Sequence, residues 1–232
     1  MTHDWRRAAE IGRAVFHSSL IPDTDEQAGP AYFQGWRLSR WLFWQRLKWV
    51  ENFLTHMAGD TLQSDRCAID FGCGFGLALP LLQDRYRLTY GIDLYPELSR
   101  EFMRRWGSGS ADNQHELIIA QSTEGAGIAD QCADLILALD VLEHFESMDG
   151  VLQQLLRLLK PTGTLLVSGP TENSAYRFGR QLVGFRGDYH HHDVYQVIAA
   201  MSKYFDVQVH HRLPWFAPLF LLITAKPKKL LS

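Results

Sequence analysis

The sequence predicts an α/β fold in which a doubly wound, mainly parallel sheet follows an N-terminal helical lid. Two observations predict it. From residue 66 onward, short apolar runs alternate with helical patterns, which is typical of parallel strands joined by helices. The expected strands are 67–71, 88–93, 116–120, 134–139 and 163–168, and the expected helices are 76–84, 96–106, 149–159 and 193–203. Two further runs, 205–212 and 219–225, are joined too closely for a parallel crossover, so we expect an antiparallel pair.

Bulk composition narrows the class of protein. The 232 residues carry a formal net charge of −3 and are 46% hydrophobic, which suits one globular domain with a cap. The acidic balance gives no general footprint for nucleic acid, so no nucleic-acid partner is expected. The three cysteines form no CxxC pair, which favours a reducing compartment. No secretory leader pattern opens the chain, and the apolar stretch 215–223 is about half of a membrane span. We therefore expect a cytoplasmic protein, soluble or peripheral to a membrane.

The N-terminal residues have a helical pattern that differs from the rest of the chain. Amphipathic segments cover roughly 4–18 and 33–58, separated by a loop with glycine and prolines. We expect residues 1–60 to form a helical cap and residues 61–232 to form the domain that carries the sheet.

A glycine-rich turn follows the first expected strand. Asp70 is followed by Gly72, Gly74 and Gly76 at alternate positions. Glycines allow positive φ and bring bare backbone against a ligand. The dinucleotide pattern is G-x-G-x-x-G, with a pyrophosphate on the helix N-terminus. A carboxylate at Asp70 would repel a pyrophosphate but pair with an ammonium group, so we expect a ligand with an amino-acid part.

The second expected strand ends in another acid. Asp93 lies about 20 residues beyond the first glycine, where an acid accepts hydrogen bonds from ribose hydroxyls in this kind of fold. Leu94 is placed to rest on an adenine face. An acid here can also simply cap the helix that starts at Pro96, but together with the glycine turn it is far more specific.

At these residues the chain resembles the class I S-adenosylmethionine-dependent methyltransferases, most closely the small-molecule, quinone-biosynthesis-like members of types 11 and 12. The resemblance covers about 66–226. Its segments are 70–76, 91–93, Asp134 to Phe145 and Leu159 to Leu166. It implies a seven-stranded Rossmann-like sheet with an antiparallel last strand, and S-adenosyl-L-methionine as cofactor. Asp70 and the glycines would cradle the methionine part, Asp93 would bind the ribose, and Asp140 would lie beside the amino group or the sulfonium.

The segment after the third expected strand departs from the family pattern. Ser122 or Thr123 stands where the family often has an Asp that holds the adenine amino group. The adenine contact is therefore left open between a hydroxyl, a backbone amide and Glu124.

Histidines are the candidate catalytic residues. His144 follows the fourth expected strand, and His190, His191 and His192 precede Asp193, a candidate helix N-cap. Neighbouring residues on a strand point to opposite faces, so at most His190 and His192 could converge on a metal, and we expect none. A neutral imidazole could instead accept a proton from the attacking group. A purely structural role for the loop is the alternative.

Other segments are candidates for acceptor contact. Tyr176, Arg177 and Arg180 follow the fifth expected strand, and the arginines suit a phosphate or carboxylate. Trp36 and His192 are further candidates for substrate binding. On the N-terminal helix, the spacing places Trp44 in a basic stripe with Arg37, Arg40 and Lys48, which suits an anionic interface or a lid. Plain packing on the sheet is the alternative for this helix.

These features together predict methyl transfer to an oxygen or nitrogen of a small molecule, including lipid-linked, glycosyl or quinone-like acceptors. A nicotinamide-dependent oxidoreductase and a non-catalytic methyltransferase-like binding protein are the alternatives. Methylation of nucleic-acid base amines is disfavoured because residues 140–143 read Asp-Val-Leu-Glu instead of Asn/Asp-Pro-Pro-aromatic.

Overall fold

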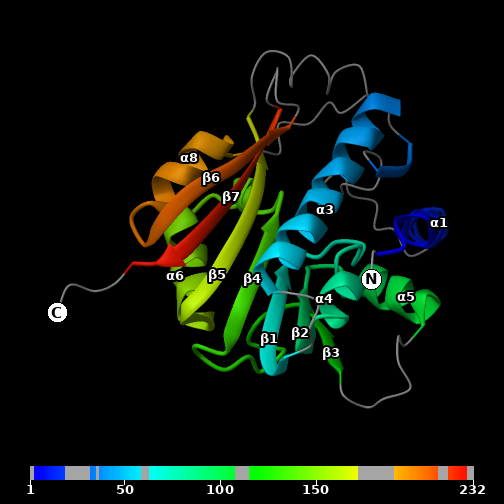
Figure 1. The fold of residues 1–232 in the computed structure, drawn as a ribbon, viewed down its shortest axis with the longest axis horizontal. Coiled ribbons are helices and arrows are strands. Elements are labelled where there is room, and N and C mark those ends of the chain that lie inside the picture. The colour runs from blue at the N-terminus through cyan, green and yellow to red at the C-terminus, as the bar shows by residue number, and fades with distance from the viewer. Residues whose placement is uncertain are drawn as a thin grey trace. The chain divides into compact units, whose positions relative to one another are not determined.

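The protein has the α/β architecture that the sequence predicts. The computed structural model describes residues 3–18, 32–34, 37–58, 63–107, 115–171, 191–213 and 219–228. Within these residues seven strands form one mixed sheet in the order β3-β2-β1-β4-β5-β7-β6 (Figure 1). The chain divides into two compact units, Met1–Ala126 and Gly127–Ser232. The predicted boundary of the cap at residue 60 stays a prediction.

The first unit contains three parallel strands and the N-terminal helices. Its elements are α1 (Trp5–Phe16), α3 (Arg37–Ala58), β1 (Gln63–Phe71), α4 (Leu79–Gln83), β2 (Tyr86–Ile92), α5 (Pro96–Trp106) and β3 (Glu116–Ala120). Strand β2 pairs in parallel with both β1 and β3. The helix expected at 76–84 is shorter than predicted, because the chain first completes the glycine turn and starts α4 only at Leu79, with Pro80 in its first turn.

The long helix α3 is amphipathic, but not in the way that the spacing suggested. Leu42, Leu47, Val50 and Leu54 are buried in the core. Trp44 does not lie in an exposed basic stripe, because its ring packs edge-on against Trp5 and Tyr32 with centroids 6.1 and 5.5 Å apart. Among the tryptophans of α3, Trp41 is exposed, at 49% of its surface. Simple spacing missed this because aromatic partners from outside the helix cover Trp44.

The second unit contains the rest of the sheet. Its elements are β4 (Ala133–Leu139), the 3-10 turn η1 (Leu142–His144), α6 (Met148–Leu158), β5 (Leu159–Pro170), α8 (Val194–Met201), β6 (Phe205–Leu213) and β7 (Phe220–Pro227). Strands β4 and β5 are parallel. Strand β7 is antiparallel to β5 on one side and to β6 on the other, as Figure 1 shows. The antiparallel pairing predicted for the last two strands is confirmed.

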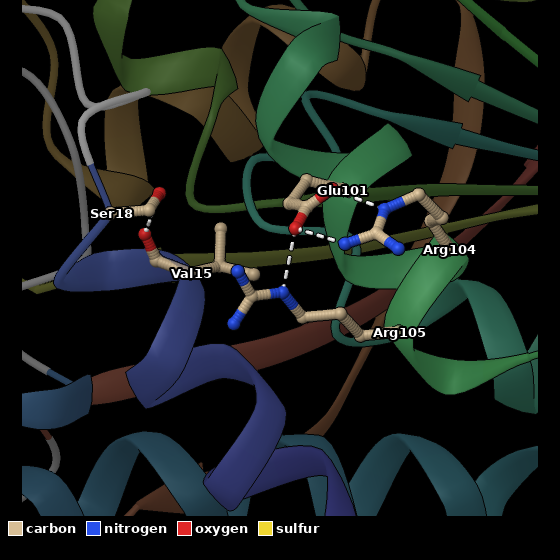
Figure 2. Close-up of polar contacts among 5 residues, drawn as sticks. All are labelled: Val15, Ser18, Glu101, Arg104 and Arg105. Atoms are coloured by element: carbon tan, nitrogen blue, oxygen red, sulfur yellow. Dashed lines mark hydrogen bonds and ion pairs between the residues drawn. The ribbon is translucent and has the colours of Figure 1, made fainter.

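Helix α5 carries a charged cluster on its surface. Glu101 accepts hydrogen bonds from Nε of Arg104 at 2.7 Å and Nε of Arg105 at 2.6 Å (Figure 2). These bonds lower the pKa of Glu101 to about 2. The cluster is exposed, so it stabilises the helix only modestly.

No helix in the described parts of the chain has the length and apolar character needed to cross a bilayer.

Candidate functional site

The turn after β1 is built by three glycines in the left-handed region of backbone conformation. Gly72, Gly74 and Gly76 have φ values of 76°, 52° and 77°. A Cβ added at Gly76 would lie 3.0 Å from the Cβ of Ser99, so this glycine allows close packing against α5. A Cβ at Gly74 would meet nothing within 4 Å. Gly74 therefore presents bare backbone to open space, as a ligand-binding turn requires.

The turn is tied to the end of the neighbouring strand. The N–H groups of Gly72 and Cys73 both donate to the carbonyl oxygen of Ile92, at 2.7 and 3.0 Å. A Cβ at Gly91 would lie 3.1 Å from Cδ1 of Leu79 and 3.4 Å from Sγ of Cys73, so this glycine lets β2 approach both the start of α4 and the turn. The end of β2 therefore holds the glycine turn in a defined position.

Asp93 joins the two segments that the sequence singled out. Its Oδ2 accepts the Gly74 N–H at 2.7 Å, and its Oδ1 accepts the Tyr95 N–H at 2.9 Å. The carboxylate is thereby fixed in orientation, and each oxygen keeps capacity to accept a further bond. Leu94, the next residue, is 65% exposed. The Nε2 of Gln121 donates to the Leu94 carbonyl at 3.2 Å. Sequence reasoning missed Gln121.

Asp70 is a buried carboxylate at the end of β1, only 3% exposed. Burial raises the pKa of Asp70 to about 7, and the negative charge of Asp93 adds to the rise. A charged form held at this cost is stabilised by a cation brought beside it. This environment is compatible with the predicted role of Asp70 beside a positively charged group, and that role stays a prediction.

The two hydroxyl groups that are candidates for the adenine contact, those of Ser122 and Thr123, differ in their surroundings. Ser122 is exposed and its Oγ accepts the Gly125 N–H at 3.0 Å within a local turn. Thr123 is buried. The structure thus separates the two neighbours, and the contact with adenine stays a prediction.

In the second unit, Asp140 follows β4 in an unusual backbone conformation. Its φ is 52°, in the left-handed region that residues with a Cβ seldom adopt. Two hydrogen bonds with Ser168 stabilise this conformation. The Asp140 N–H donates to the Ser168 carbonyl at 3.0 Å, and the Ser168 Oγ donates to Asp140 Oδ1 at 2.7 Å. Ser168 is completely buried in β5. Sequence reasoning missed Ser168, because a single serine in an apolar strand gives no pairing signal.

The histidines that precede α8 come to the turn that contains His144. The carbonyl oxygen of Glu143 accepts the N–H groups of His191 and His192 at 2.9 and 3.3 Å. Asp193 caps α8 with a capping box, so its predicted role as N-cap is confirmed. His191 is exposed, whereas His144 and His192 are half-buried. Among the residues that the structure describes, no three His, Cys, Asp or Glu side chains are grouped to hold a metal ion.

Several predicted site residues lie outside the described residues. These are the acceptor contacts Trp36, Tyr176, Arg177 and Arg180, and the catalytic candidate His190.

Comparisons with known proteins agree with this geometry. A family model described as "Methyltransferase domain" matches residues 44–207. A curated relative, fusarielin synthase FSL1 of Gibberella zeae, is 27% identical over 124 residues, which are 51% of this chain and 5% of that protein. The chain thus spans a small fraction of the length of this relative.

Solved structures with similar folds include two methyltransferases. One is the N-methyltransferase NodS from Bradyrhizobium japonicum in complex with S-adenosyl-L-homocysteine, with a TM-score of 0.59 at 14% identity, covering 96% of this chain and 100% of that one. The other is the CurJ carbon methyltransferase, with a TM-score of 0.60 at 15% identity, covering 79% and 54%. These likenesses show the fold, and the family match extends over well over half of the chain. The chain therefore belongs to the methyltransferase-domain family.

Proposed function

We propose that this protein transfers the methyl group of S-adenosylmethionine to an oxygen or nitrogen of a small molecule, with lipid-linked, glycosyl and quinone-like acceptors as the expected class. One observation carries the cofactor assignment. A buried carboxylate with a raised pKa, Asp70, precedes a turn in which Gly74 faces open space. The carboxylate suits a ligand that has an ammonium group, and the turn allows that ligand to approach the backbone closely.

The first unit holds the cofactor in this proposal. Asp70 pairs with the ammonium group, and Gly72, Gly74 and Gly76 leave room for the methionine part. Asp93, oriented by the Gly74 and Tyr95 N–H groups, accepts from the ribose hydroxyls. When bound, S-adenosylmethionine supplies a methyl group on a sulfonium, which is open to in-line displacement.

Leu94, Ser122 and Thr123 provide the adenine side of the site in this proposal. The exposed leucine side chain offers an apolar surface for a ring. The candidate polar contacts are a hydroxyl of Ser122 or Thr123, a backbone amide of this segment, and Glu124.

Asp140 is proposed to orient the reacting groups. Strained backbone at a non-glycine residue costs free energy and is concentrated at functional sites. At Asp140 the strain coexists with two hydrogen bonds to one buried serine: the Asp140 N–H donates to the Ser168 carbonyl, and the Ser168 hydroxyl donates to the carboxylate and orients it. This combination favours a role in positioning over a role in stability.

A comparison of two strained residues tests this role. Gln131 has a φ of 51°, matching that of Asp140, and lies in an exposed turn before β4. Replacing Gln131 with glycine should stabilise the fold by roughly 1 kcal/mol, because the left-handed conformation suits glycine, and should leave kcat unchanged. Asp140→Gly should relieve the same strain yet lower kcat by at least tenfold. Full methyltransferase activity in Asp140→Gly, measured beside Gln131→Gly with melting curves for both, would argue against the role of Asp140.

A histidine near the turn is the proposed general base. The hydrogen bonds between Glu143 and the backbone of residues 191 and 192 bring His191 and His192 to the same turn as His144. His144 and His191 are the candidates in the described chain, with His190 as a third, and His192 is proposed for acceptor contact. A base is needed only where the attacking group arrives protonated, and positioning supplies much of the rate of an in-line displacement.

The proposed class of acceptor molecule is based on the sequence and not on the fold. The similar structures include both an N-methyltransferase and a carbon methyltransferase, so the fold alone does not select the acceptor atom. Tyr176, Arg177, Arg180 and Trp36 remain the proposed acceptor contacts. The exposed residues of α3 include Trp41 with Arg37 and Lys48, and contact of this face with an anionic membrane stays a prediction.

Titration calorimetry with S-adenosylhomocysteine tests the proposed function. We expect saturable binding with one site per chain, and no binding of NAD under the same conditions. A thermal-shift experiment with the two ligands gives the same discrimination at lower cost, since only a ligand that binds the folded state raises the melting temperature. A shift with NAD and none with S-adenosylhomocysteine would instead favour the oxidoreductase alternative.

A further inference from the structure

Helix α1 lies directly against the glycine turn. The three buried residues of this helix are Ala8, Gly12 and Val15, spaced along one face. A Cβ added at Gly12 would lie 2.6 Å from Cζ of Phe33 and 3.1 Å from Cδ2 of Leu77. Leu77 comes immediately after the last glycine of the turn. A glycine in the interior of a helix is unfavourable, so its presence here indicates that close approach is required.

An aromatic cluster continues this contact onto the turn itself. The ring of Phe33 lies edge-on to Phe75 with centroids 5.5 Å apart. Phe16, the last residue of α1, contacts both rings at 5.6 and 6.2 Å. Phe75 stands between Gly74 and Gly76, the two glycines that face the open space and α5. The residue between these two glycines therefore packs against rings that belong to the N-terminal segment.

The N-terminal end of α1, which lies away from this aromatic cluster, is held by contacts with α3 and α5. The carboxylate of Glu51 on α3 accepts the His3 N–H at 2.6 Å and the indole N–H of Trp5. The His3 ring stacks on Trp106 at 5.1 Å, and the Arg7 guanidinium lies over the same indole and donates to the Trp106 carbonyl.

The C-terminal end of α1 is capped by a side-chain hydrogen bond, and the helix packs against α5. The Ser18 hydroxyl donates to the Val15 carbonyl at 2.6 Å (Figure 2). Figure 1 shows α1 lying beside α5, with which it is in contact. Helix α1 is thus held at both ends, and its middle, at Gly12, packs closely against Phe33 and Leu77.

We propose that α1 is a positioning element of the cofactor site, in which Gly12 seats Phe33 and thereby fixes Phe75 and the glycine turn. This inference rests on the proposed function, since it assigns to the N-terminal segment a contribution to cofactor affinity. Linkage then requires that the cofactor strengthens the seating of α1 by the same factor by which that seating strengthens cofactor binding.

Two matched glycine substitutions test the proposal. Gly12→Ala introduces a methyl group that must displace the Phe33 ring or Leu77. Gly150→Ala is the control, because Gly150 also lies in a helix, α6, and a Cβ there would meet nothing within 4 Å. Both changes improve helix propensity. We expect the dissociation constant for S-adenosylhomocysteine to rise about tenfold in Gly12→Ala, within the usual range of coupling between sites, and to stay unchanged in Gly150→Ala.

A second variant distinguishes displacement of the ring from general damage to the fold. Phe33→Leu removes the ring atoms nearest to Gly12, so Gly12→Ala should cost much less affinity in that background, and the two effects should not add. Hydrogen exchange provides an independent measurement: S-adenosylhomocysteine should slow exchange of α1 amides in the unmodified protein and should do so less in Gly12→Ala.

Two results would overturn the inference. One is an equal affinity of Gly12→Ala and Gly150→Ala for S-adenosylhomocysteine, and the other is additive losses in the Gly12→Ala, Phe33→Leu double variant. Failure of the unmodified protein to bind S-adenosylhomocysteine would be a different outcome, because it would contradict the proposed function itself.

Discussion

Replacing Asp93 with alanine should weaken binding of S-adenosylhomocysteine by roughly 1.5–3 kcal/mol, or about 10- to 150-fold, as loss of a charged hydrogen-bonding partner does. The proposed bonds to the ribose would be lost. In addition, the Gly74 and Tyr95 N–H groups would lose the acceptor that holds them at 2.7 and 2.9 Å. The same residue thus serves the ligand and the shape of the turn, which is why a large effect is expected. Titration calorimetry measures it directly.

Two further variants separate these contributions. Asp93→Asn keeps an oxygen that can accept one backbone N–H but removes the charge, so its loss should be smaller than that of the alanine variant. Glu97→Ala removes a neighbouring exposed carboxylate that forms only a surface ion pair with Arg100, and should leave affinity unchanged. Equal affinities of Asp93→Ala and the unmodified protein would refute the assignment.

Cofactor affinity should depend on pH through Asp70. Its pKa of about 7 means that the carboxyl group holds a proton for about half of the time at pH 7. An ammonium group favours the ionised form, so binding must release this proton. Affinity for S-adenosylhomocysteine should therefore be greatest above pH 7 and fall by up to about tenfold for each pH unit below it. Calorimetry in buffers of different ionisation enthalpy counts the protons released at each pH.

The substitution Asp70→Asn is the matched control for this dependence. It keeps the shape of the side chain, and it should lower affinity at pH 8 while abolishing the dependence between pH 5 and 7. A proton count that is zero in the unmodified protein, or unchanged in Asp70→Asn, would contradict the role of Asp70.

The same pKa shift gives a prediction for stability without ligand. Because the folded protein binds the proton more tightly than the unfolded chain, whose carboxyl has a pKa near 3.8, stability falls as pH rises through the window from about 4 to about 7. Asp70→Asn should therefore be more stable than the unmodified protein above pH 7, by an amount on the order of a few kcal/mol.

The sequence predicted most of the fold and the backbone form of the glycine turn, because both depend on local patterns. The strand 116–120 and the helix 96–106 have the predicted bounds, since apolar runs and a proline start delimit them. The glycines at 72, 74 and 76 have the positive φ that their spacing implied. Asp70 is the penultimate residue of β1 and Asp93 directly follows β2, so their positions could be predicted from the strand pattern.

Other features depend on contacts between distant residues, which a single sequence does not encode in a readable pattern. Ser168 holds Asp140 across two neighbouring strands. Trp44 is covered by Trp5 and Tyr32, so its helical spacing with basic residues was misleading. Gly12 looked like an ordinary position in an amphipathic helix, and only the approach of Phe33 shows why a side chain is excluded there.

The place of β7 between β5 and β6 has a consequence for the order in which the protein folds. Strand β5 pairs residues 165–170 with residues 220–225, which the ribosome makes much later. Until then the edge of β5 has open N–H and C=O groups beside apolar side chains, a surface that pairs readily with other chains. The nascent chain therefore passes through a stage in which five of the seven strands have been made and the edge of β5 is still unpaired, and chaperone binding would be most useful at that stage.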